Sequence, residues 1–237
     1  MIILCLLNIF ENFLFPDFAL NTNKFNPADF IEQRLFISLG GEEKFGINEM
    51  RTYNADLQIR PFRLRLKTFG NELYRENSFE LSGGFLIYKT LTGGIGIGLL
   101  NNWIKDYTNR FTYTVKIGSV YYLSNLRFDF CLNNINHPEF SETDYLPVTY
   151  LLGASYFINQ EIKPYFYMMG KEKDRPFFKP GLFIKPTKNL EIFTGISTEN
   201  FLFEFGLRLL LGRIILDYAG TSHRQLGLTH SFFVNFF

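Results

Sequence analysis

Basic residues occupy alternate positions in one short stretch of this sequence. Arg63, Arg65 and Lys67 are separated by single leucines, which places all three on the same face of a β-strand. Cations about 7 Å apart repel one another unless acids lie close by. Such a row forms either an anion filter or a salt-bridged network. Asp56 and Glu80, in the adjacent segments, fall on the same face, so we predict a paired network.

Charges of both signs recur on the corresponding face of other segments with the same alternation. Mixed signs favour ion pairing inside a closed structure, whereas a ring of one sign is typical of ion selection. A polar conduit or ligand site is the functional alternative. The predicted network consists of Asp56, Arg63, Arg65, Lys67, Glu80, Lys116, Arg127, Asp129, Glu191, Glu204, Arg208 and Asp217.

Residue types that carry catalysis or bind metals are sparse and poorly spaced. His137, His223 and His230 have no spacing typical of metal ligands and no acidic or thiol cluster beside them. Ser222 precedes His223, but sequence neighbours rarely form a catalytic triad and no third member is apparent. The glycines of 93–98 lie within a strand pattern with no helix after it, unlike those of a dinucleotide-binding turn. We therefore expect no enzyme, no metal site and no cofactor.

A period of two, typical of β-strands, runs from Arg34 almost to the end of the chain. After Phe201, phenylalanines and leucines alternate with residues such as Glu204 and Arg208. Aromatic residues make up 18% of the sequence and charged residues 20%, which fits a barrel with an apolar outside and a polar inside. No apolar run reaches the ~18 residues that a spanning helix needs. We predict an all-β fold, an antiparallel transmembrane β-barrel of about fourteen strands, with about twelve as the alternative.

The connections between the predicted strands alternate in length. Short turns fall near residues 60, 90, 124, 160, 187 and 212, and the links between them are longer in nearly every case. Outer-membrane barrels have short periplasmic turns and longer extracellular loops, whereas a soluble β-sandwich predicts no such alternation. The longer loops are predicted at 40–50, 70–77, 101–109, 134–146 and 170–175.

The chain divides into three parts. Residues 1–19 have the apolar core of a secretory signal without a preceding Lys or Arg, and we expect the true start to lie upstream. Residues 20–33 are predicted to form a short periplasmic segment, and the barrel spans 34–237. Cys5 lies in the signal and Cys131 on the inner face, so the mature chain is expected to have no internal disulfide.

Two short motifs bracket the chain. Asn26-Pro27-Ala28 lies near its start, and a segment reading LDYA precedes a final strand that closes on phenylalanine. These motifs resemble those of fatty-acid-transporter-like outer-membrane barrels and of the related PorV and PorQ group, which is tied to type IX secretion. The terminal phenylalanine also resembles the C-terminal strand signal of bacterial outer-membrane barrels. The matching residues are Asn26, Pro27, Ala28, Leu216, Asp217, Tyr218, Ala219, Leu226, Gly227, His230 and Phe237.

The resemblance implies a non-enzymatic barrel in the outer membrane of a Gram-negative bacterium. Its first implied role is secretion-associated or structural, with loops that bind partners. The alternative is a channel for small hydrophobic molecules, and a soluble β-sandwich binding module is a further one. A charge-filled lumen favours the first role, and an apolar pocket inside the barrel favours the second.

The expected partners follow from this placement. They are outer-membrane lipid and the barrel-assembly machinery, together with secretion-system proteins or hydrophobic small molecules, depending on the role. The net charge of +1 gives no reason to expect nucleic acid.

Overall fold

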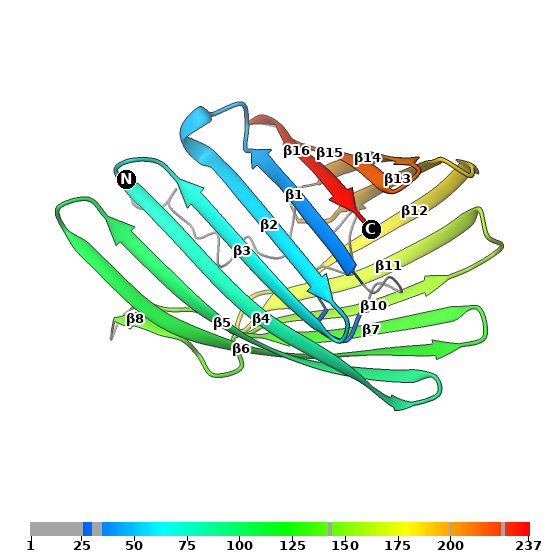
Figure 1. Cartoon of the computed structure of the whole chain (residues 1–237), viewed down its shortest axis with the longest axis horizontal. Helices are drawn as coiled ribbons and strands as arrows, with labels where there is room; N and C mark the ends of the chain where they lie inside the picture. Colours follow the sequence, from blue (N-terminus) through cyan, green and yellow to red (C-terminus); the bar gives the residue numbers. More distant parts are fainter. Residues whose placement is uncertain (1–25, 30–34, 142–143, 200, 224–225) are drawn as a thin grey trace.

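Hydrogen-bonded strands follow one another around a closed antiparallel barrel in the computed structural model (Figure 1). The structure describes residues 26–29, 35–141, 144–199, 201–223 and 226–237; the predicted signal at 1–19 and most of 20–33 lie outside this part. Fourteen strands form the wall, so the predicted fold is confirmed. They are β1 (Leu35–Glu43), β2 (Arg51–Ile59), β3 (Phe62–Gly70), β4 (Tyr74–Tyr88), β5 (Leu91–Ile104), β6 (Thr108–Leu123), β7 (Leu126–Asn133), β10 (Thr149–Tyr156), β11 (Ile162–Lys171), β12 (Phe177–Thr187), β13 (Leu190–Ser197), β14 (Leu202–Leu211), β15 (Ile214–His223) and β16 (Gly227–Phe236).

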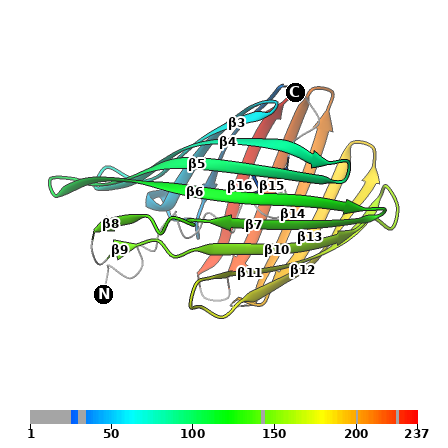
Figure 2. The same cartoon turned by 90° about the horizontal axis from the view of Figure 1, so that it is seen from below.

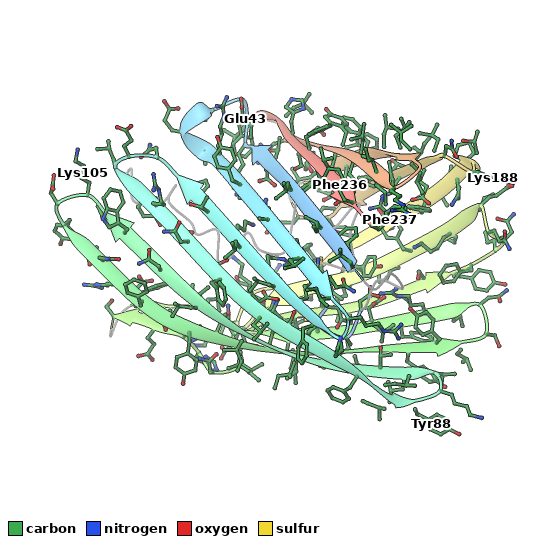
Figure 3. All side chains as sticks on the ribbon, in the orientation of Figure 1. Glu43, Tyr88, Lys105, Lys188, Phe236 and Phe237 are labelled. Atoms are coloured by element: carbon green, nitrogen blue, oxygen red, sulfur yellow. The ribbon has the colours of Figure 1, made fainter. Side chains whose placement is uncertain are left out.

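The barrel closes where the first wall strand meets the last. β1 pairs with β16 in a continuous antiparallel register that runs from Ile37 opposite Phe236 to Glu43 opposite His230. A closed sheet leaves no unpaired edge, which lets it cross hydrocarbon without exposing backbone polar groups. Phe237 lies just beyond Phe236, the last paired residue of β16 (Figure 3).

Alternation along each strand separates an apolar outer face from a polar inner one. In β14, Phe203 and Leu207 are 46% and 45% exposed, whereas Glu204 between them is buried. Phenylalanine, leucine and isoleucine dominate the exposed outer face of the other strands as well. The part of the chain that the structure describes contains no helix long and apolar enough to cross a membrane.

The two ends of the barrel differ. The connections at 60–61, 89–90, 124–125, 157–161, 188–189 and 212–213 all lie at one end, which we term the turn end. Tyr88 and Lys188 mark it in Figure 3, and Glu43 and Lys105 mark the opposite end, which we term the loop end. The turn end corresponds to the periplasmic end of outer-membrane barrels, and the loop end to the extracellular one.

Several strands continue further at the loop end than the sequence predicts. Most of the predicted loops at 70–77 and 101–109 belongs to strands, and the actual connections are only 71–73 and 105–107. The ladder between β4 and β5 continues to Tyr74 opposite Ile104, and that between β5 and β6 to Ile104 opposite Thr108, so β5 and β6 project beyond β7 at this end (Figure 2). Polar residues on both faces conceal the alternation there, because a strand outside the hydrocarbon has no need of an apolar face.

The longest loop, 134–148, covers an exposed strand edge. It contains the two short strands β8 (Glu139–Ser141) and β9 (Asp144–Tyr145). β7 pairs with β6 only from Lys116 onward, so the loop-end half of β6 lacks a strand on that side. Asn136 substitutes for one: its side-chain oxygen accepts from Val115 N at 2.8 Å, and its amide donates to Tyr113 O at 2.8 Å.

Cysteine labelling on intact cells tests the orientation. A cysteine at Lys105, at the loop end, is expected to react with a membrane-impermeant maleimide, and a cysteine at Lys188 is not. The sequence has two cysteines, of which Cys131 is fully buried, so a parent with Cys5→Ser provides a low background. Labelling of the Lys188 variant alone would show that the barrel has the opposite orientation in the membrane.

An arginine on the outer face tests which face meets lipid. Leu207→Arg, in the middle of β14, is expected to lower the free energy of unfolding in bilayers by about 2–4 kcal/mol, because the charge enters hydrocarbon. Ile214→Arg, at the turn end of β15, is the matched control with an expected loss of about 0–1 kcal/mol. Equal losses at the two positions, measured by urea unfolding, would contradict the assignment.

Candidate functional site: the lumen of the barrel

Charged side chains from most of the wall strands point into the lumen. All members of the predicted network lie on the inner face of their strands, and most are buried. Arg65 is 3% exposed and Asp217 is 0% exposed. Charges shielded to this degree are stable only beside opposite charges and hydrogen-bonding groups. Neighbouring strands supply these partners.

Asp56 of β2 holds two arginines of β3. The register places Asp56 opposite Arg65, with Gln58 opposite Arg63. Arg63 makes two parallel hydrogen bonds to the carboxylate, Nε to Oδ1 at 2.7 Å and Nη2 to Oδ2 at 2.6 Å. Arg65 Nε lies 3.4 Å from Asp56 Oδ2. The repulsion along the basic row is therefore offset across the ladder.

Glu80 of β4 has a different partner from the one predicted. It faces Arg65 in the register, but its direct ion pair is with Lys116 of β6, at 2.5 Å. Lys116 reaches it across β5, where Gly96 is its register partner. A Cβ at Gly96 would lie 2.8 Å from Lys116 Cγ, so only a glycine leaves room for the lysine stem.

A second set of ion pairs occupies the opposite side of the lumen. Lys179 of β12 pairs with Glu204 of β14. Arg208 Nε lies 2.7 Å from Asp217 Oδ1, and its Nη1 lies 3.5 Å from Glu191 Oε2. These groups join β12 to β15, so the ion pairs connect strands that are not adjacent as well as those that are.

The described N-terminal residues 26–29 lie against the inner wall near the turn end, although the sequence predicts this segment to be periplasmic. Asp29 pairs with Arg127 of β7, which also binds Asp129 at 2.6 Å. The Asn26 amide donates to two backbone oxygens of the wall, at 2.9 and 3.1 Å. Hydrogen bonds thus hold Asn26 of the Asn-Pro-Ala motif, and an ion pair holds Asp29 directly after the motif.

Two glycines of the inner wall leave room for this segment. Gly94 of β5 is opposite Gly118 of β6 in the register. A Cβ at Gly94 would lie 2.2 Å from the Pro27 carbonyl carbon, and a Cβ at Gly118 would lie 2.1 Å from Asn26 Oδ1. The alternating glycines of β5 therefore let main chain and side chains approach the wall, and they do not form a phosphate-binding turn.

A further charged cluster lies at the loop end. Glu76 is fully buried and accepts a hydrogen bond from Tyr74. Lys44, in the connection after β1, lies 4.0 Å from Glu42 and over the ring of Phe69. Burial lowers the pKa of Lys44 from its ordinary value, and the charge of Glu42 acts in the opposite direction. This end of the lumen is therefore lined by paired charges too.

An apolar strip interrupts the charged lining. Cys131 of β7, Leu151 of β10, Tyr167 and Met169 of β11, and Phe177 of β12 form one cluster of buried side chains on the inner wall. Tyr165 packs against it. Thiol, thioether and aromatic groups provide a polarisable surface with few competing hydrogen-bonding atoms. We term these five buried residues the lumen strip.

The long loop covers the lumen at the loop end. Leu146 is 1% exposed and packs against Leu100, an inner-face residue of β5, together with Phe140 of β8. A small cavity of ≈ 20 Å³ lies in the lumen beside Leu100, and Glu80, Lys116 and other polar residues line it. It has room for a few waters at most, so a larger solute requires the loop or the N-terminal segment to move.

Several lumen residues escaped the sequence prediction, for different reasons. Glu42 and Glu76 lie in strand extensions that the sequence presents as loops, and Asp29 lies in a segment without alternation. Lys179 follows the alternation of β12, so the alternation could have identified it, but the predicted network leaves it out. The lumen strip was missed because its residues differ in type and lie on four strands, so their proximity depends on register.

The family-motif residues do not form one site. Asp217 is inside, whereas Tyr218 and His230 lie outside and are joined by a 2.8 Å hydrogen bond between Tyr218 Oη and His230 Nδ1. Leu226 is exposed in the connection before β16. Among the described residues, no group of three or more His, Cys, Asp or Glu side chains is placed to hold a metal ion.

Comparison with known proteins finds similarity in structure and none in sequence. No protein-family model matches the sequence, and no curated protein matches it. The monoaromatic hydrocarbon channel CymD has a TM-score of 0.60 at 8% identity, over 93% of this chain and 92% of that one. This chain has the fold of an outer-membrane β-barrel. The toluene transporters TbuX of Ralstonia pickettii and TodX of Pseudomonas putida have TM-scores of 0.57 and 0.59 at 8% and 10% identity, each over 89% of this chain and 90% of the other.

A double-mutant cycle tests the ion pair between Glu80 and Lys116. Each single change, Glu80→Leu or Lys116→Met, is expected to lower the free energy of unfolding by about 3–5 kcal/mol, because it leaves one buried charge without its partner. The double change is expected to cost less than the sum of the two. The exposed pair of Glu43 and Arg51 is the control, for which changes to glutamine should have little effect. Additive losses at the buried pair would show that the two residues are not coupled.

Proposed function

We propose that this protein is a channel of the bacterial outer membrane for small hydrophobic molecules. The observation that carries the proposal is the lumen strip, an apolar cluster of buried side chains on the inner wall from β7 to β12, which lies beside ion-paired parts of the same wall. Such side chains favour apolar solutes, because a polar solute would lose hydrogen bonds to water that an apolar wall cannot replace.

The charged part of the lumen supports the same proposal. Asp56 with its two arginines, Glu80 with Lys116, and Glu204 with Lys179 bring opposite signs into direct contact. Paired charges leave little net field to attract either cations or anions. A channel of this kind is expected to conduct ions poorly while it admits neutral apolar solutes.

The structural neighbours add support of a coarser kind. CymD is described as a monoaromatic hydrocarbon channel, and TbuX and TodX as toluene transporters. By analogy with them, the solute of this chain belongs to the class of small, neutral, apolar molecules, and single-ring aromatic hydrocarbons are its first candidates.

A secretion-associated role is the second proposal. It rests on the motifs shared with the PorV and PorQ group and on the long 134–148 loop with its β8–β9 hairpin, which offers a partner an extracellular surface. Recovery of secretion-system proteins with the purified barrel, together with no solute transport, would favour this role over a channel.

Transport measurements in proteoliposomes test the channel. Purified protein is expected to accelerate the entry of toluene into vesicles that enclose a solvatochromic dye, with little effect on potassium chloride conductance. Leu151→Asn places an amide in the lumen strip and is expected to slow entry about tenfold, which corresponds to ~1.4 kcal/mol. Leu151→Met, which conserves volume and polarity, is the matched control and should transport normally. Entry no faster than in empty vesicles would contradict the proposal.

A further inference from the structure

The outer wall changes character in successive rows near the loop end. Reading across the register from β1 to β5, one row consists of Leu39, Ala55, Leu66, Phe79 and Leu99, all apolar. Two residues nearer the loop end, the next row consists of Gly41, Tyr53, Thr68, Asn77 and Asn101. The apolar belt of the barrel therefore ends between these two rows, and the second row includes the amide side chains of Asn77 and Asn101.

Hydrogen bonds join the polar members of the second row into a ladder on the outside of the barrel. Thr68 Oγ1 donates to Asn77 Oδ1 at 2.7 Å, and Asn77 Nδ2 donates to Asn101 Oδ1 at 3.0 Å. Asn101 Nδ2 in turn donates to Asn109 Oδ1 at 2.6 Å. Asn101 Nδ2 also donates to Arg110 O at 3.2 Å, so both of its N–H groups are used. The side-chain oxygens of the ladder each have a second lone pair, which can accept from hydroxyl groups at the surface of the membrane.

Two grooves flank Tyr53 at this boundary. One, of ≈ 560 Å³, is lined by Leu39, Gly41 and Phe232 among others; the second, of ≈ 430 Å³, is lined by Ala55, Leu66 and Phe79 among others. Gly41 and Ala55 provide the space, because the neighbouring residues of their rows are larger. The floors of both grooves are apolar, and both open outward onto the face that meets lipid.

Cationic groups lie directly beyond the two grooves. Arg51 lies at the rim of the larger groove and is paired with Glu43 at 2.9 Å. Arg75, opposite Trp103 in the register, lies with its guanidinium 6.0 Å from the centre of the indole ring. The charged side chains of this third row thus include two arginines and one glutamate, which leaves a positive balance beside the amide ladder.

We propose that this surface binds a phosphorylated glycolipid of the outer leaflet. Acyl chains occupy the two grooves beside Tyr53, sugar hydroxyls bond to the amides of Asn77 and Asn101, and phosphate lies at Arg75 and Arg51. Two adjacent grooves accommodate a lipid with two or more acyl chains. An amide ladder and an indole suit a sugar better than a simple glycerol headgroup, since sugars present several hydroxyls and an apolar ring face.

The test uses the full-length protein in detergent micelles and lipid A as the probe. Trp103 is the only tryptophan in the sequence, so its fluorescence reports on this surface alone. A saturable change in emission is expected as lipid A is added. Arg51→Gln with Arg75→Gln is expected to raise the midpoint concentration about thirtyfold, which is about fivefold for each charge removed. Lys188→Gln, at the turn end, is the matched control and should leave the midpoint unchanged.

A second variant tests the grooves independently of charge. Gly41→Leu fills the larger groove and should weaken binding, whereas Ala154→Leu, on the outer face of β10, should not. The amount of lipid A that remains with each purified variant, determined by mass spectrometry, provides a readout that does not depend on the environment of Trp103. Equal binding of phosphatidylglycerol would overturn the glycolipid in favour of anionic lipid in general. A linear response to lipid A, or arginine variants that bind like the parent, would overturn the site itself.

Discussion

The pairing of β1 with β16 is the constraint on which the rest of the structure depends. It satisfies the backbone groups of both terminal strands, so the sheet can lie in hydrocarbon without a polar edge. Closure also fixes which side chains are enclosed. Every inner-face residue must share one limited space, and a charge such as Asp217 has to find its partner there rather than in solvent.

Competition for this enclosed space explains the composition of the inner wall. Large groups alternate with residues that have no side chain: Lys116 lies over Gly96, and the N-terminal segment lies over Gly94 and Gly118. Phe193 likewise fills the position left by Gly206, where a Cβ would lie 1.7 Å from its ring. Ion pairs, glycines and aromatic rings thus pack together in the same enclosed space, and the lumen strip is the part of it that apolar side chains fill.

The sequence was sufficient for the fold because a period of two survives in nearly every strand. The count of about fourteen strands and the six short turns follow from that pattern, and the composition of the two faces favours a closed barrel. Register does not, and it decides which charges meet: Glu80 has the right parity to face Arg65, yet Lys116 reaches it across a glycine. The loop-end extensions of β4 and β5 were missed because strands beyond the hydrocarbon need no apolar face.

The long loop has a consequence for self-association through the edge of β6. Asn136 takes the hydrogen bonds of Tyr113 and Val115 that a neighbouring strand would otherwise make. An uncovered edge of this kind is a template on which a strand from another copy can add. Asn136 therefore ends the ladder at this edge of the sheet. It bonds β6 through its side chain, and a side chain presents no outer row of N–H and C=O groups to which another strand could pair.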